Sequence, residues 1–148
     1  MSAPKKRIEI KLEGNLDSVE LAEELVLCIA VASGFDEENC HRIGMSVREG
    51  MINAVQYGSR QVREKLVRMS VELLPDRMEI RLADSGKGFN LADVPDPLAE
   101  ENLLKSSGRG IFLMRAFMDE FDVRRSREGG TELVLVKRLP SAPQAEAL

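Results

Sequence analysis

The chain has 148 residues, of which 43% are hydrophobic and only 4% aromatic, so we expect one compact domain with a mainly aliphatic core. A net charge of -4, with 21 basic and 25 acidic residues spread along the chain, gives no broad cationic field and argues against direct nucleic-acid binding. Two cysteines, no apolar signal core and no apolar run of membrane-spanning length predict a soluble cytoplasmic protein without membrane contact.

The first predicted elements are a strand and a helix. Apolar and charged residues alternate over 7–12, the period-two pattern of a half-buried strand. A helix is expected to begin at Asp17, whose spacing to Glu20 resembles a capping box, and to stop at Ser33-Gly34. Its predicted apolar stripe comprises Leu21, Leu25, Cys28, Ile29 and Ala32, so Cys28 is predicted to be a reduced core residue.

A second helix is predicted from an Asp36 cap to near Gly58-Ser59, with acidic residues in its first turn. Its predicted core stripe comprises Cys40, Ile43, Val47, Met51 and Ala54, and Cys40 is again expected to be reduced. His41, the only histidine, lies on this helix, where a surface or packing role is expected.

Alternating apolar residues over 67–73 and 78–82 flank Pro75-Asp76 and predict an antiparallel hairpin, which leaves Asp84 at the next inward-facing position. Residues 85–109 lack periodicity and are too long for a simple connection, so we predict a functional lid. A helix over 110–118 and a hairpin over 121–138 follow.

This order of elements predicts an α/β fold, a two-layer sandwich with a mixed, mostly antiparallel sheet covered by helices on one face. A single domain is expected over residues 1–139, followed by a disordered tail over 140–148.

The first chemical segment is Glu49-Gly50-Met51-Ile52-Asn53. Four-residue spacing on a helix places the side chains of Glu49 and Asn53 on one face. Carboxylate and carboxamide oxygens suit Mg²⁺, which is usually bound through few protein groups plus substrate phosphates. Taken alone, the pair also fits an exposed polar helix face.

The second segment is Asp84-Ser85-Gly86-Lys87-Gly88. A strand ends there in an inward carboxylate, and Gly86 and Gly88 allow a tight turn and close approach to a ligand. A buried carboxylate needs hydrogen-bond donors, and the exocyclic amine of adenine is one. An ordinary strand followed by an Asp-Gly turn is the alternative.

The third segment is Ser107-Gly108-Arg109-Gly110, predicted to stand just ahead of an apolar helix, where backbone N–H groups and the helix dipole could receive phosphate. Arg109 could add positive charge. Neither a Walker A motif nor a dinucleotide fingerprint is present, because Lys87 precedes a glycine and the third fingerprint glycine is missing.

As a set, the three segments resemble the N, G1 and G2 boxes of the GHKL (Bergerat-fold) ATPase superfamily. The short length and the Gly130-Thr131 pair make the chain most similar to the anti-sigma-factor serine kinases of bacterial partner-switching systems. This resemblance implies a Bergerat ATP-binding fold, with ATP and Mg²⁺ as ligands.

The resemblance also implies residue roles. Glu49 would be the general base or an orienting carboxylate, Asn53 the Mg²⁺ ligand and Asp84 the adenine acceptor. Thr131 would bridge to adenine through water, unless it is an ordinary strand residue. Glycines 86, 88, 108 and 110 would shape the pocket, and Lys105 and Arg109 would contact the γ-phosphate, unless they are solvated charges.

The implied function is that of a protein-serine kinase which phosphorylates an anti-anti-sigma (STAS-type) partner and sequesters a sigma factor. Many relatives carry His four residues after the N-box Asn, where this chain has Tyr57, a departure that favours ATP binding without phosphoryl transfer. The alternatives are an ATP-dependent partner-switch module without transfer and a detached histidine-kinase-like ATPase domain. A homodimer is left open.

Overall fold

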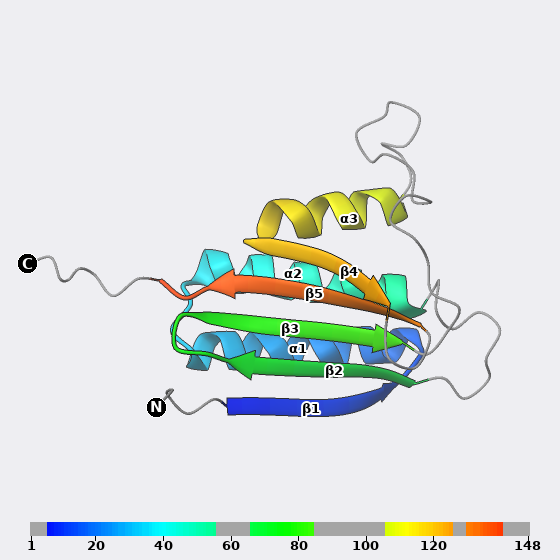
Figure 1. Cartoon of the computed structure of the whole chain (residues 1–148), viewed down its shortest axis with the longest axis horizontal. Coiled ribbons are helices and arrows are strands. Elements are labelled where there is room, and N and C mark those ends of the chain that lie inside the picture. Colours follow the sequence, from blue (N-terminus) through cyan, green and yellow to red (C-terminus); the bar gives the residue numbers. More distant parts are fainter. Residues whose placement is uncertain (1–5, 56–65, 85–105, 126–129, 141–148) are drawn as a thin grey trace, which may run out of the picture.

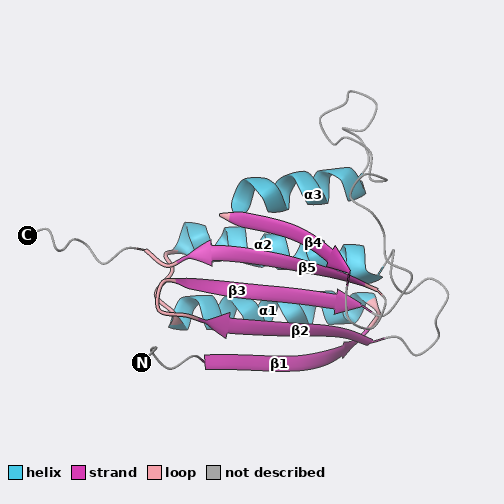
Figure 2. Cartoon of the chain, viewed as in Figure 1, coloured by secondary structure: helices cyan, strands magenta, loops and turns pink. Residues whose placement is uncertain are grey.

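The computed structural model describes residues 6–55, 66–84, 106–125 and 130–140, and in 106–109 the backbone only. The elements are β1 (Lys6–Glu13), α1 (Leu16–Ala32), α2 (Glu37–Asn53), β2 (Leu66–Leu73), β3 (Arg77–Asp84), α3 (Ser106–Phe117), β4 (Glu120–Arg125) and β5 (Thr131–Arg138). The strands form one sheet in the order β1-β2-β3-β5-β4, and all three helices lie on one face of it (Figures 1 and 2). The predicted two-layer α/β sandwich is confirmed.

Every described strand pairing is antiparallel, including β3 with β5. Because side chains alternate along a strand, Met69, Leu82 and Leu133 all point to the helix-covered face and are at most 3% exposed. The predicted hairpins are confirmed as β2–β3 and β4–β5. Aliphatic side chains and methionines from the sheet and the helices form one core between the two layers.

The predicted start and buried face of the second helix are confirmed. The Asp36 side chain accepts a hydrogen bond from the backbone N–H of Asn39 at 2.8 Å, which satisfies one of the free donors at the start of α2. Every residue of its predicted apolar stripe, Cys40 included, is buried. His41 is exposed. The predicted end near residues 58 and 59 lies outside the described residues.

The predicted start and core face of the first helix are wrong. Asn15 is the N-cap and accepts from the N–H of Ser18 at 3.1 Å, so Asp17 lies inside the first turn. The residues that α1 buries are Ser18, Val19, Ala22, Val26, Ile29 and Ala30. Only Ile29 of the predicted stripe is among them, while Leu21 is 58% exposed and Cys28 is exposed. Apolar residues lie on two sides of α1, so periodicity alone could not choose the buried side.

The helices pack closely on one another through glycines of α2. A Cβ at Gly44 would lie 2.9 Å from Leu27 Cδ2 of α1. A Cβ at Gly50 would lie 2.7 Å from Leu82 Cδ1 of β3 and 3.6 Å from the Met114 sulfur of α3. These close approaches fix the position of α2 against both neighbouring helices and the sheet.

The third helix begins earlier than predicted. Because α3 starts at Ser106, Gly108, Arg109 and Gly110 lie within the helix and not ahead of it. Its other end is held by β5: the Lys137 ammonium, a buried group on the helix face of the sheet, donates to the carbonyl oxygen of Phe117 at 2.6 Å. A cation at a helix C-terminus also interacts favourably with the helix dipole.

Two further sequence predictions, the lid over residues 85–109 and the disordered tail, fall wholly or mainly outside the described residues. In the part of the chain that the structure describes, no helix is long and apolar enough to cross a membrane.

Candidate nucleotide-binding site

The candidate site lies at one end of the sandwich. The C-terminal ends of α2 and β3 meet there with the N-terminal ends of α3 and β5 (Figure 1). Four of the predicted site residues, Glu49, Asn53, Asp84 and Thr131, lie on these converging elements. The fold therefore brings together segments that are separated by more than thirty positions in the printed sequence.

Asn53 occupies the last turn of α2 and is only 2% exposed. Its side-chain nitrogen Nδ2 is buried and has no hydrogen-bond partner among the residues that the structure describes. A buried polar atom without a partner costs free energy in the folded protein. Such an atom is most simply explained by a ligand or solvent molecule that the carboxamide contacts, and turning the amide by 180° would present its oxygen instead.

Glu49 lies one turn earlier on the same face of α2 and packs against α3. A Cβ at Gly110 would lie 2.6 Å from Glu49 Oε1, so the lack of a side chain at Gly110 leaves room for the carboxylate. Burial raises the pKa of Glu49, and the nearby Arg48 charge lowers it by a smaller amount. The result is a partly buried carboxylate with a raised pKa, a property common among catalytic acids and bases.

Asp84 ends β3 with its side chain on the helix-covered face of the sheet, and it is 4% exposed. The backbone N–H of Thr131 donates to Asp84 Oδ1 at 3.5 Å, the long end of the hydrogen-bond range. Thr131 itself is buried on the neighbouring β5. The predicted neighbourhood of Asp84 and Thr131 is therefore present in the structure.

Gly130 is a site residue whose role the sequence did not reveal. A Cβ there would meet the Asp84 carbonyl oxygen and would lie 2.6 Å from Asp84 Oδ1. Only glycine allows this approach of two backbones without displacing the carboxylate. The signal available in the sequence was the Gly129-Gly130 pair just before a strand, which reads equally well as a hairpin turn.

Other predicted site residues are not placed. Gly86, Gly88 and Lys105 lie outside the described residues, and of Gly108 and Arg109 only the helical backbone is described. Their suggested contacts with nucleotide phosphates stay predictions.

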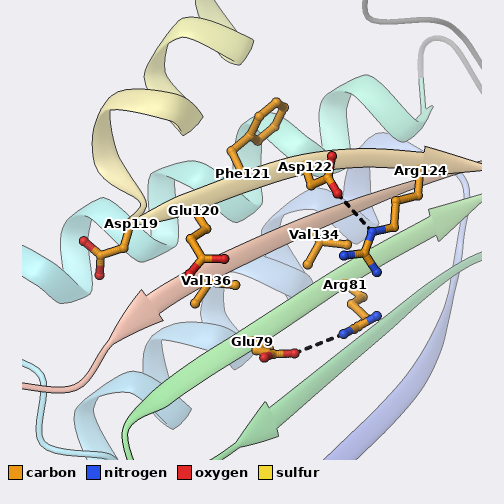
Figure 3. Close-up of a pocket in the computed structure, with 9 residues that line it drawn as sticks. All are labelled: Glu79, Arg81, Asp119, Glu120, Phe121, Asp122, Arg124, Val134 and Val136. Atoms are coloured by element: carbon orange, nitrogen blue, oxygen red, sulfur yellow. Dashed lines mark hydrogen bonds and ion pairs between the residues drawn. The ribbon is translucent and has the colours of Figure 1, made fainter.

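A cavity of about 540 Å³ lies elsewhere, on the open face of the sheet. Figure 3 shows that charged side chains line it and pair with one another: Arg81 contacts Glu79 at 3.0 Å, and Arg124 contacts Asp122 at 3.0 Å. None of the predicted site residues lines it. Because these charges already have partners, this cavity is a weaker candidate than the buried end of the sandwich.

The chain belongs to the family of histidine kinase-like ATPase domains, whose model matches residues 12–137. This is the GHKL superfamily that the three sequence segments resembled. Since the family consists of ATPase domains, membership implies an ATP-binding site.

Within this family, the chain is similar to anti-sigma factors and serine-protein kinases. The chain is 29% identical over 99 residues to an anti-sigma F factor from Clostridium perfringens, which covers 66% of this chain and 71% of that protein. It is 26% identical over 136 residues to the serine-protein kinase RsbW from Oceanobacillus iheyensis, which covers 88% of this chain and 85% of the relative.

Solved structures support the fold. The RsbU and RsbW domains of a Mycobacterium tuberculosis protein match with a TM-score of 0.66 at 17% identity, covering 93% of this chain and 34% of that one. The histidine kinase domain of a blue-light activated kinase from Erythrobacter litoralis matches with a TM-score of 0.57 at 19% identity, covering 86% of this chain and 63% of that one.

Proposed function

We propose that the chain is an ATP-binding anti-sigma factor and protein-serine kinase, which phosphorylates an anti-anti-sigma (STAS-type) protein and otherwise sequesters a sigma factor. The observation that carries the proposal is the pair of buried polar side chains, Asn53 and Asp84, at one end of the sandwich. Similarity to anti-sigma F factors and RsbW kinases supplies the class of partner.

In the proposed complex, Asp84 accepts a hydrogen bond from the exocyclic amine of adenine. Thr131 lies beside Asp84 and contacts the base through a water molecule. A site that depends on an acceptor at this point discriminates against guanine, whose corresponding edge carries no amine there.

The residues present also fit a magnesium ion. Turning the Asn53 amide would place its oxygen where the unpartnered Nδ2 lies. With the Glu49 carboxylate on the same helix face, it would then form a donor set of the hard oxygen type that Mg²⁺ prefers. When bound, the ion neutralises charge on the phosphates. We assign Asn53 as its protein ligand.

Glu49 is the proposed base. In the transfer step the serine oxygen of the partner forms a bond to the γ-phosphorus, the bond from that phosphorus to the β,γ-bridging oxygen breaks, and ADP leaves. The serine proton passes to the Glu49 carboxylate. Its raised pKa makes this carboxylate a stronger proton acceptor than a solvated glutamate.

A second function is favoured by one residue. Tyr57 stands where many relatives carry His, which favours an ATP-dependent partner-switch module that binds without transferring phosphate. A detached histidine-kinase-like ATPase domain is the third alternative.

The test is to incubate the purified chain with γ-labelled ATP and the candidate STAS protein, with the same STAS protein carrying Ala at its acceptor serine as the control. Label on the first partner alone supports the kinase. Nucleotide-dependent binding of the partner without label supports the switch module, and absence of both binding and label contradicts the proposal.

A further inference from the structure

Ser46 of α2 carries a buried hydroxyl group for which neither the core nor the nucleotide site accounts. The residue is fully buried, and its Oγ has no hydrogen-bond partner among the residues that the structure describes. It does not donate to the backbone carbonyl four residues earlier, a common acceptor for a serine within a helix. Because a buried hydroxyl without a partner costs free energy, we expect it to find an acceptor nearby.

The hydroxyl lies at the interface between α2 and α3. One turn before Ser46, the Arg42 guanidinium carbon lies 5.7 Å from the centroid of the Phe117 ring of α3. One turn after it, Glu49 packs against Gly110 of α3. Residues three and four positions apart lie on one face of a helix, so Ser46 faces α3 between these two contacts.

The Glu49 carboxylate is the acceptor that helix geometry brings closest on this face. At a spacing of three residues the two Cβ atoms lie roughly 5 to 6 Å apart. Helical side chains lean toward the N-terminus of their helix, so Glu49 covers the turn that contains Ser46. Since a carboxylate has two oxygens, Oε1 can stay beside Gly110 while Oε2 accepts from the hydroxyl. Rotation about side-chain bonds is enough to form this hydrogen bond.

The two arginines of this part of α2 already contact other carboxylates. Arg48 contacts Glu23 of α1 at 2.9 Å, and Arg42 contacts Glu38, one turn earlier on α2, at 2.7 Å. Both arginines are thus committed, whereas the hydroxyl of Ser46 has no partner among the described residues.

We propose that Ser46 is a positioning residue for Glu49, whose carboxylate accepts a hydrogen bond from the buried hydroxyl. The bond restricts the Glu49 side chain to one rotamer and leaves its other oxygen available to the site. A base that is itself oriented by a third group is a recurrent arrangement in catalytic sites. The effect on catalysis rests on the proposed function, whereas the hydrogen bond itself does not.

A double-mutant cycle tests the hydrogen bond without any assay of activity. Urea unfolding is measured for the unaltered chain, Ser46→Ala, Glu49→Ala and the double variant. Ser46→Ala removes a partnered hydroxyl from the unaltered chain but an unpartnered one from the Glu49→Ala background. It should therefore destabilise the first and stabilise the second, with a difference of about tenfold in the unfolding equilibrium constant. Equal effects in the two backgrounds would overturn the proposal.

Ser33→Ala is the matched control for this cycle. The Ser33 hydroxyl donates to the carbonyl oxygen of Ile29 at 2.7 Å, at the C-terminal end of α1. Its partner does not involve Glu49, so Ser33→Ala should change the unfolding equilibrium constant by the same factor in both backgrounds. Circular dichroism of each variant in the absence of urea checks that it is folded.

Phosphoryl transfer tests the catalytic consequence. Ser46→Ala should lower the single-turnover transfer rate by about tenfold and leave ATP affinity unchanged, because positioning of the base acts on the chemical step. Ser46→Cys keeps an atom in the place of the hydroxyl but is a weak donor, so it should also transfer slowly. A role in packing alone would leave Ser46→Cys near the normal rate.

A normal transfer rate in folded Ser46→Ala, or a normal rate in Ser46→Cys beside a slow Ser46→Ala, would overturn the positioning role. If the unaltered chain transfers no phosphate to its partner, the proposed function fails, and the double-mutant cycle alone decides whether the hydrogen bond exists.

Discussion

Asp84 is the side chain on which the proposed adenine contact depends. We expect Asp84→Ala to weaken ATP binding by about 5- to 150-fold or more, because the adenine amine loses its acceptor at a cost on the order of 1 to 3 kcal/mol or more. Isothermal titration calorimetry measures the effect. Asp84→Asn keeps the shape and serves as a check on folding, and Asp122→Ala, exposed on β4, is the control. Unchanged ATP affinity in the folded Asp84→Ala variant would show that adenine does not bind beside Asp84.

A substitution at Glu49 distinguishes ATP binding from phosphoryl transfer. Glu49→Gln keeps the size of the side chain but cannot accept the serine proton, so the transfer rate should fall by roughly 10² or more while ATP affinity changes little. Single-turnover transfer to the labelled partner measures the rate, and calorimetry measures the affinity. Normal transfer by the variant would show that Glu49 is not the base.

The raised pKa of Glu49 gives this prediction a pH dependence. Burial raises that pKa, and the base works only when ionised. As pH falls, wild-type phosphoryl transfer should therefore begin to slow at a higher pH than it would with an ordinary glutamate. The Glu49→Gln variant should lack this loss of rate at low pH.

The same pKa affects stability. Because the folded pKa lies above the unfolded one, the stability from protonated Glu49 is present at low pH and is lost as pH rises through the folded pKa. Glu49→Gln should then be at least as stable as the wild type at neutral pH.

At the scale of elements, two glycines of α2 predict opposite responses to the same change. Because alanine has a higher helix propensity than glycine, replacing Gly by Ala within a helix stabilises the folded state by about 1 kcal/mol when nothing clashes. At Gly44 the atoms nearest to the new methyl group belong to Leu27, a half-buried side chain that can move, so Gly44→Ala should keep or raise the melting temperature. At Gly50 it meets the buried Leu82 and Leu133, and overpacking costs about 1 to 3 kcal/mol.

Thermal unfolding followed by circular dichroism compares the two variants directly. Gly50→Ala should melt below the wild type and below Gly44→Ala. The reverse order would mean that α2 does not approach the sheet as closely as Gly50 implies.

The helices also show how far sequence alone could predict this fold. The start and buried face of α2 followed from the Asp36 cap and from one apolar stripe. α1 has apolar residues on two sides, and α2 packs against Leu27 and Glu23, so the tertiary contact decided which side is buried. The start of α3 was placed too late because two glycines were taken as a boundary.

The site was predictable to a similar degree. Glu49, Asn53 and Asp84 were recognisable because their spacing and their position at element ends are local properties. The close approach of Gly130 to Asp84 joins segments distant in sequence, and no local pattern reports such a contact.

At the scale of the whole molecule, ligand binding should appear as stability. Saturation with MgATP at 100 times its dissociation constant should stabilise the folded state by about 2.7 kcal/mol, visible as a rise in melting temperature. In the wild type, EDTA should reduce this rise because it removes Mg²⁺. The Asn53→Ala variant should show, even without EDTA, only the smaller rise that the wild type shows with EDTA. Circular dichroism of the free variant checks that it is folded. If ATP raises the melting temperature of the wild type equally with and without EDTA, the proposed Mg²⁺ site is contradicted.

The strand order has a consequence for how the chain reaches this structure. β2–β3 and β4–β5 are local hairpins, whereas β1 pairs with β2 across α1 and α2, with Lys6 opposite Leu73. Contacts between distant residues form only after the entropy of closing the intervening loop has been lost. We therefore expect both hairpins to form early and β1 to dock late. Until it docks, the edge of β2 with Val67, Met69 and Val71 is open, and the β1 strand of another molecule can occupy it, so refolding at high concentration favours exchange of β1 between chains.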